Sequence, residues 1–130
     1  MSDALSTVQN LYGCFGRGDI AALLQLLTPD VEWQFVGDRK AAYTGRAKGH
    51  GAVGEWFGAV AGCDDIQAFE PREFLVGTDH VTVLGFERTR DPQTGRVFEC
   101  EWIHVWRVNN GKASRFWGML DTEAAAAARA

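Results

Sequence analysis

A histidine between two tryptophans is the residue best placed for chemistry. His104 lies in the stretch Trp102-Ile103-His104-Val105-Trp106, which alternates as a β-strand does. Alternation puts Trp102, His104 and Trp106 on one face of that strand. Burial beside two indoles would lower the pKa of the imidazole and keep the ring neutral, unless a carboxylate faces it. A neutral imidazole donates one hydrogen bond and accepts another, so His104 could serve as a general acid or base, or as an oxyanion donor.

The same histidine has a structural alternative, bonded to a backbone group or to a dimer neighbour. Asp121, at the end of the last predicted strand, lies close to where that strand pairs with the strand of His104. It could orient the imidazole as the third group of a relay, which makes His104 and Asp121 the candidate catalytic residues. Asp121 could instead cap a C-terminal helix that begins at Thr122, and this is the interpretation that we favour.

Aromatic side chains recur along the chain and could line a pocket around His104. The 130 residues include five Trp, eight Phe and two Tyr. Such side chains form the core by default, but a fold with a cavity also needs them around its void. The candidates for substrate binding are Tyr12, Trp33, Phe35, Tyr43, Trp56, Phe57, Trp102 and Phe116.

Composition and charge argue against several classes of function. The net charge is −4 and no basic stripe occurs, which argues against a nucleic-acid partner. No apolar run approaches a membrane span and no secretory signal opens the chain, so we expect a cytoplasmic protein. The three cysteines are widely spaced, which indicates reduced thiols and no zinc site. We therefore expect no metal, no cofactor and a small hydrophobic molecule as the partner.

The hydrophobic pattern predicts the elements that must position these residues. Apolar residues at helical spacing predict helices over 4–16, 20–27 and about 50–62. Alternation predicts strands over 31–36, 66–76, 79–90, 97–108 and 113–121. Residues 37–48 are expected to form a loop. Its basic residues could attract an acidic substrate, although we favour a solvated loop; they are Arg39, Lys40, Arg46 and Lys48.

The turns and the order of the elements indicate the fold class. Turn residues at 91–95 and 109–112 predict antiparallel hairpins, and Pro71 predicts a bulge or an edge strand. We predict an α+β fold, a conical barrel in which a strongly curved, mixed and mostly antiparallel sheet carries three helices on its concave face. One domain is expected over residues 1–121, followed by a short alanine-rich tail over residues 122–130.

Segments spread over nearly the whole chain resemble a known family. The sequence is similar to the ketosteroid-isomerase-like, SnoaL-like members of the nuclear transport factor 2 superfamily. The resemblance is carried by residues 12–19, 27–33, 51–57 and 95–121. It implies a pocket between sheet and helices, and a homodimer formed through the sheet. Glu99, Glu101 and Arg107, on the strand face opposite His104, fit such an interface or an exposed face.

The resemblance also says which catalytic positions of the family are kept. In the steroid isomerases an Asp base lies on the strand after the second helix, and this sequence has Phe35 there. His104 falls where the family keeps the acid of its oxyanion hole, and Tyr12 lies near the family tyrosine. The epoxide hydrolases carry an Asp on the last strand, where this sequence has Gly118. The resemblance therefore implies His104 as a pocket residue, without the acids of the known reactions.

Three functional hypotheses follow. The first is an enzyme of the isomerase, cyclase or dehydratase type, acting by acid/base chemistry on a hydrophobic ring-like substrate. His104 would be the acid/base or oxyanion donor, assisted by Tyr43 or Tyr12. The second is a binding protein that sequesters a small hydrophobic ligand without catalysis. The third, weaker hypothesis is a protein-interaction dimer whose cavity is filled by Trp33 and Trp56.

Overall fold

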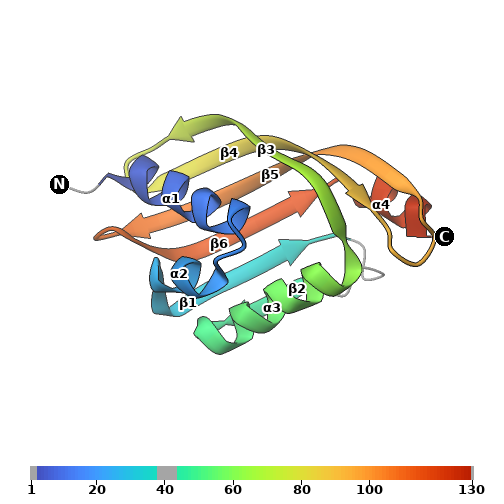
Figure 1. Ribbon diagram of the computed structural model, residues 1–130. Helices are drawn as coiled ribbons and strands as arrows, with labels where there is room; N and C mark the ends of the chain where they lie inside the picture. Colours follow the sequence, from blue (N-terminus) through green and yellow to red (C-terminus); the bar gives the residue numbers. More distant parts are fainter. Residues whose placement is uncertain (1–2, 38–43, 130) are drawn as a thin grey trace.

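The computed structural model describes residues 3–37 and 44–129 of the chain. The helices are α1 (Ala4–Gly16), α2 (Ile20–Gln25), α3 (Gly49–Cys63) and α4 (Thr122–Arg129). The strands are β1 (Leu27–Val36), β2 (Gly45–Lys48), β3 (Asp65–Val76), β4 (His80–Arg90), β5 (Val97–Asn109) and β6 (Lys112–Leu120). Figure 1 shows these elements as one sheet with α1, α2 and α3 over one of its faces.

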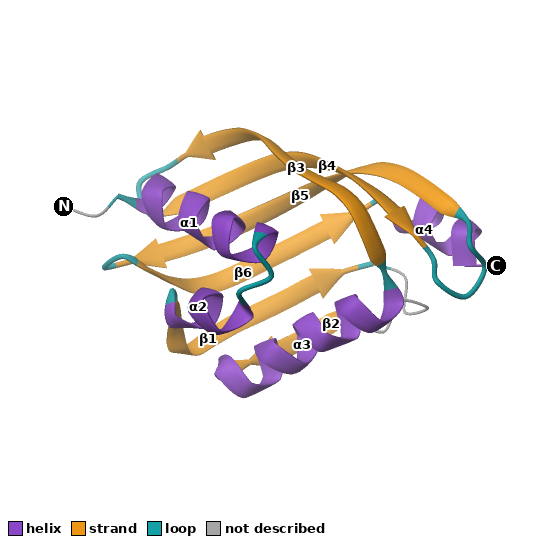
Figure 2. Ribbon diagram, in the orientation of Figure 1, coloured by secondary structure: helices purple, strands orange, loops and turns teal. Residues whose placement is uncertain are grey.

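The sheet is mixed and mostly antiparallel, as predicted. Its strands lie in the order β2-β1-β6-β5-β4-β3. β1 and β6 are parallel, and the other neighbouring strands are antiparallel. Helix α1 contacts β3 to β6, and α3 contacts β1 and β2 (Figure 2). The helices therefore cover both halves of one sheet face, and the core lies between the two layers.

Local sequence signals account for where several elements begin and end. Asp3 caps α1, because its Oδ1 accepts a hydrogen bond from the backbone N–H of Ser6 at 2.6 Å. Asp19 caps α2 in the same way, through the N–H of Ala22 at 3.1 Å. The turn between β5 and β6 places Asn110 at φ 52° and Gly111 at φ 79°, a conformation that favours these two residue types.

The boundaries of the second helix and the first strand differ from the prediction. We predicted a helix to residue 27, but α2 ends at Gln25 and β1 begins at Leu27, which pairs with Ala113 of β6. A register shift between Leu27 and Glu32 takes up the segment that contains Pro29, which has no N–H to donate. Pairing with β6 therefore extends the strand through a segment that we predicted would end a helix.

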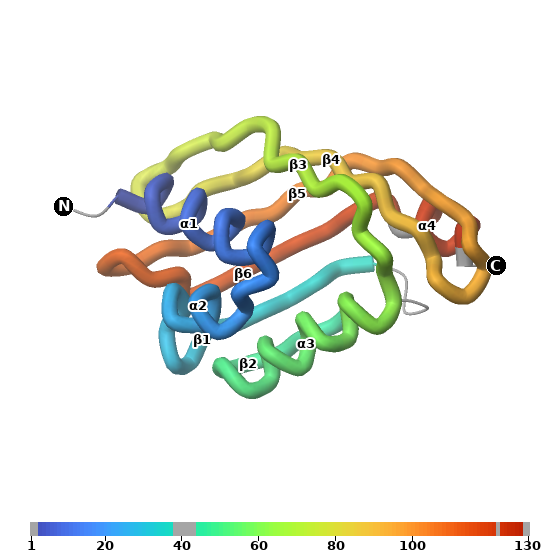
Figure 3. The backbone as a smooth tube through the Cα atoms, viewed as in Figure 1, coloured from blue at the N-terminus to red at the C-terminus, as the bar shows by residue number. Residues whose placement is uncertain are grey.

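The structure revises one further prediction, and the C-terminal helix that we favoured is present. Residues 37–48 were expected to be a loop, but 45–48 form the edge strand β2, in which Arg46 pairs with Gln34. The alanine-rich tail forms α4, which packs Ala125 and Ala128 against Phe98 and Cys100 of β5. Figure 3 shows this helix at the end of the sheet opposite the start of α1. Among the described residues, no helix is long and apolar enough to cross a membrane.

The edge position of β3 confirms the prediction from Pro71. β3 is the last strand in the sheet order, and its pairing with β4 shifts register between Pro71 and Glu73. An edge strand tolerates a residue that cannot donate to the sheet.

Candidate functional site

A cavity lies between the helices and the inner face of the sheet. Its volume is about 60 Å³, within a pocket of about 620 Å³ that includes space open to solvent. A few water molecules fit in 60 Å³, whereas a benzene-sized ring needs roughly 150 Å³. A ring-like ligand therefore requires side chains at the mouth to move apart. The lining residues include Tyr12, Trp33, Phe35, Trp56, Phe57, His104, Trp106 and Phe116.

His104 lies in this cavity on the buried face of β5. It is 8% exposed, and its neighbours on that face, Trp102 and Trp106, are 2% and 3% exposed. Alternation along the strand therefore places the three side chains together, as predicted. His104 pairs with Val83 on β4 and with Gly118 on β6, so strands on both sides hold its backbone.

A short polar chain joins His104 to α1. The hydroxyl oxygen of Tyr12 lies 2.7 Å from Nδ1 of His104 and accepts a hydrogen bond from the indole N–H of Trp106 at 3.0 Å. The side chain of Tyr12 therefore points from α1 into the pocket. With Nδ1 occupied, Nε2 is the ring nitrogen left to meet a ligand. Among the described residues, no carboxylate bonds to the imidazole.

Burial sets the protonation state of this pair. Desolvation lowers the pKa of His104 to about 3, so the imidazole is neutral at physiological pH. The pKa of Tyr12 is raised far above its usual value, mainly by burial, with a smaller opposing effect from the hydrogen bond of Trp106. Both groups are therefore neutral hydrogen-bonding groups at pH 7.

Aromatic rings fix the position of the imidazole. The Trp102 ring stacks on His104 at 4.1 Å between centroids, and the Phe116 ring meets it edge-on at 4.8 Å. Trp102 in turn stacks on Phe69 at 4.7 Å. A Cβ at Gly85 would lie 2.1 Å from the Trp102 ring, so only glycine lets this indole lie flat over β4. The imidazole therefore has little freedom to rotate.

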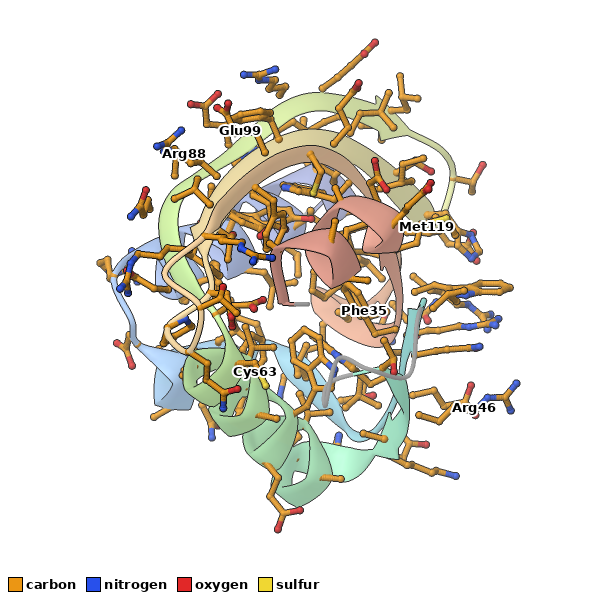
Figure 4. All side chains as sticks on the ribbon, turned by 90° about the vertical axis from the view of Figure 1, so that its right-hand side faces the viewer. Phe35, Arg46, Cys63, Arg88, Glu99 and Met119 are labelled. Atoms are coloured by element: carbon orange, nitrogen blue, oxygen red, sulfur yellow. The ribbon has the colours of Figure 1, made fainter. Side chains whose placement is uncertain are left out.

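Aromatic rings occupy the space at positions 35 and 118, where the resemblance implied the acids of the steroid isomerases and of the epoxide hydrolases. Phe35 lines the cavity, and Figure 4 shows it on the inner side of β1. A Cβ at Gly118 would lie 2.5 Å from the Phe116 ring and 3.0 Å from the Phe35 ring. A carboxylate at position 118 would therefore require both rings to move.

Asp121 caps α4. Its Oδ1 accepts a hydrogen bond from the backbone N–H of Ala124 at 3.1 Å, and its side chain is exposed. It does not contact the imidazole, whose partner is Tyr12, so the predicted relay is wrong and the cap that we favoured is present.

Two of the predicted substrate-binding residues are not in the pocket wall that the structure describes. Trp102 stacks on His104 but is not among the lining residues. Tyr43 lies outside the described residues.

Sequence reasoning missed two acidic residues of the cavity wall. Glu87 and Asp64 are 4% and 7% exposed and line the pocket with His104. Glu87 accepts a hydrogen bond from Thr89 at 2.5 Å. Because Val83 pairs with His104 and Glu87 pairs with Cys100, the acid lies roughly 13 Å along the strands from the imidazole. The buried alternation of β4, continued past Gly85, would have predicted Glu87.

The acidic end of the pocket affects a neighbouring thiol. Burial raises the pKa of Cys100 to about 12, and the nearby charge of Glu87 adds to this effect. Cys14 and Cys100 are buried and Cys63 is half-buried, and all three are free thiols. In the part of the chain that the structure describes, no group of three His, Cys, Asp or Glu side chains could hold a metal ion.

Comparison with known proteins now identifies the family. The family model of the SnoaL-like domain matches residues 8–116, which include both Tyr12 and His104. The chain belongs to the SnoaL-like family. A comparison with curated proteins gives no match.

Solved structures share the whole architecture of this SnoaL-like domain. An NTF2-like protein from Burkholderia xenovorans is 30% identical, with a TM-score of 0.85 over 95% of this chain and 93% of that one. An NTF2-like protein from Burkholderia thailandensis is 26% identical, with a TM-score of 0.91 over 100% and 99% of the two chains. TerC, co-crystallized with polyporic acid, is 28% identical, with a TM-score of 0.82 over 95% of each chain.

Proposed function

We propose that this SnoaL-like domain is a small-molecule enzyme of the isomerase, cyclase or dehydratase type. Its substrate would be a hydrophobic, ring-like molecule held between the helices and the sheet. The observation that carries the proposal is the Tyr12–His104 hydrogen bond at 2.7 Å inside an aromatic cavity. A polar pair in a mostly apolar pocket orients a substrate and provides the reacting group.

The electrostatics favour one of the two roles considered for His104. An imidazole whose pKa is about 3 is a weak base. Its remaining N–H can still donate to a carbonyl oxygen and stabilise negative charge that develops there, and such donors are most effective where water is excluded. We therefore assign His104 the role of oxyanion donor, with Tyr12 as its support.

Two further considerations support a small-molecule ligand. TerC, which matches this chain over its length, was crystallized with polyporic acid. The pocket is also lined by aromatic rings on which a ring-like ligand could stack, and Trp56 and Phe57 contribute two of them from α3. We propose that the sheet wraps around this pocket as a conical barrel.

Turnover by matched variants tests the enzyme proposal. Purified protein would be incubated with a panel of aromatic ketones and cyclic diketones, and products would be followed by mass spectrometry. We expect His104→Ala to lower turnover by about a hundredfold or more, as loss of an oxyanion donor does. His80→Ala is the control, because His80 is exposed and pairs with Asp79 at 2.7 Å outside the pocket. Equal turnover by the two variants would reject the proposal.

The alternative is a binding protein that holds a hydrophobic ligand without converting it. The replacement of family acids by Phe35 and Gly118 favours it, because both positions lack a group that could abstract a proton. It predicts saturable binding with the ligand recovered unchanged. The protein-interaction hypothesis would require a filled cavity, whereas a cavity of about 60 Å³ remains beside Trp33 and Trp56.

We also propose that a second copy of the chain covers the outer sheet face. Ile103, Met119 and Val36 pair in a row across β5, β6 and β1, and each is about 40% exposed, as is Trp117. Exposed apolar rows of this kind commonly mark protein interfaces. Sedimentation should show a dimer that Met119→Lys weakens. A wild-type monomer at micromolar concentration would reject the proposed dimer.

The cytoplasmic location, the absence of a cofactor and the domain limits at residues 1–121 stay predictions.

A further inference from the structure

We propose that Trp106 is a positioning residue that fixes the tautomer of His104. Its indole N–H holds the Tyr12 hydroxyl so that this hydroxyl donates to Nδ1, which leaves His104 as an Nε2–H donor. The pocket would then select ligands that present an acceptor oxygen at this point. This inference rests on the pocket of the proposed function and names the ligand chemistry that the pocket recognises.

The number of donors and acceptors in this chain of three residues decides which way its hydrogen bonds run. The Trp106 indole can only donate, and its partner is the Tyr12 oxygen at 3.0 Å. Tyr12 has one proton of its own, and its other close partner is Nδ1 of His104 at 2.7 Å. If the hydroxyl donates to Nδ1, both Trp106 and Tyr12 have partners and one donor, Nε2–H, is left for a ligand.

The other tautomer leaves more groups without partners. If Nδ1–H donated to the Tyr12 oxygen, that oxygen would accept two hydrogen bonds and its own proton would need another acceptor. Nε2 would also lack a donor. A buried polar group without a partner costs about 1–3 kcal/mol, so two such groups disfavour this arrangement relative to one. Without the Trp106 donor, the Tyr12 oxygen would itself lack a partner when its hydroxyl donates to Nδ1, so both tautomers would leave two groups unpaired.

A fixed Nε2–H donor on His104 determines which class of ligand the pocket favours. A fixed Nε2–H donates to carbonyl, enolate or phenolate oxygens and cannot accept from a hydroxyl group. A hydrocarbon of the same shape fills the pocket but leaves the donor unpaired. Discrimination between the two should therefore be about fivefold for a single neutral hydrogen bond.

Trp102 provides a matched control for Trp106. Both indoles lie on the buried face of β5, at 2% and 3% exposure, and both contact His104. The Trp102 N–H is buried and has no hydrogen-bond partner among the residues that the structure describes, whereas the Trp106 N–H donates to Tyr12. Replacement by Phe removes similar volume at either site, but only at Trp106 does it remove a donor from the chain.

Nitrogen-15 NMR of the histidine rings in the ligand-free protein tests the tautomer. A ring nitrogen that carries a proton resonates far from one that does not, and the His104 signals are assigned by their loss in His104→Gln. We expect wild-type His104 to carry its proton on Nε2 near pH 7, and Trp106→Phe to shift Nδ1 toward the protonated value. Trp102→Phe should keep the wild-type pattern.

Two results would overturn the inference. One is a wild-type His104 ring protonated at Nδ1. This measurement needs no variant, so it tests the inference even if Trp106→Phe fails to fold. The other is a folded Trp106→Phe protein with the wild-type tautomer.

Binding of acetophenone and of isopropylbenzene, followed on the same sample, tests the ligand class. These probes share a shape and differ in the carbonyl oxygen. We expect acetophenone to bind about fivefold more tightly and to shift Nε2. Equal affinity without an Nε2 shift would overturn the ligand class, while loss of turnover in His104→Ala would still support the enzyme. Conversely, absence of any turnover would reject the enzyme and leave the tautomer standing.

Discussion

Lowering the pH should reduce the free energy of unfolding of this protein through the titration of His104. The buried imidazole has a pKa of about 3, against 6.5 for an ordinary histidine, so below pH 6.5 the unfolded chain takes up a proton that the folded chain refuses. The effect leaves the free energy of unfolding unchanged above pH 6.5 and lowers it progressively as the pH falls from 6.5 toward 3. Each pH unit in that window costs about 1.4 kcal/mol, so near pH 5 the loss is about 2 kcal/mol.

Urea unfolding of the wild type and of His104→Gln at about pH 7.5 and pH 5 measures this effect. The variant removes the titrating ring and keeps a polar side chain that Tyr12 can bond. The free energy of unfolding of the wild type should fall by about 2 kcal/mol more than that of the variant, because the other groups titrate equally in both proteins. A parallel fall in the two proteins would refute the assignment of a strongly depressed pKa to His104.

Three further predictions concern substitutions of Gly85, Gly58 and Asp121. Gly85→Ala should lower the free energy of unfolding by about 1–3 kcal/mol, because its Cβ would lie 2.1 Å from the Trp102 ring. Gly58→Ala, in an exposed and open position on α3, should raise it by up to about 1 kcal/mol; thermal melts of both compare them. Asp121→Ala should cost about 1 kcal/mol through loss of the α4 cap and leave ligand binding unchanged, whereas reduced binding would restore the relay.

The strands and helices were predictable wherever one periodicity dominates. β5 alternates without interruption, and its buried face agrees with the prediction at Trp102, His104 and Trp106. The prediction failed where partners far away in the sequence determine the structure. Leu27 becomes a strand residue because Ala113 pairs with it, and the segment that includes Arg46 becomes β2 because β1 offers a free edge. Pairing across such distances leaves no local signal in the sequence.

The candidate site was predictable in position and less so in its partners. His104 and most of its aromatic neighbours share faces that alternation reveals. Its hydrogen-bond partner is Tyr12, on a helix early in the chain, and helix periodicity alone does not fix which lining residue reaches a given strand residue. Glu87 was missed because a carboxylate is rarely buried, although Glu87 and Thr89 continue the buried face of Val81 and Val83.

The aromatic rings packed around positions 35 and 118 bear on the role that we propose for His104. With Phe35 and Phe116 packed over Gly118, a base on β1 or β6 would need space that these rings occupy. Phe116 also packs edge-on against the imidazole, and the burial of His104 keeps its ring neutral. A neutral donor in a dry pocket stabilises negative charge on a ligand oxygen more effectively than one in water. The space that the two rings occupy and the burial of the proposed donor are therefore two consequences of one packing arrangement.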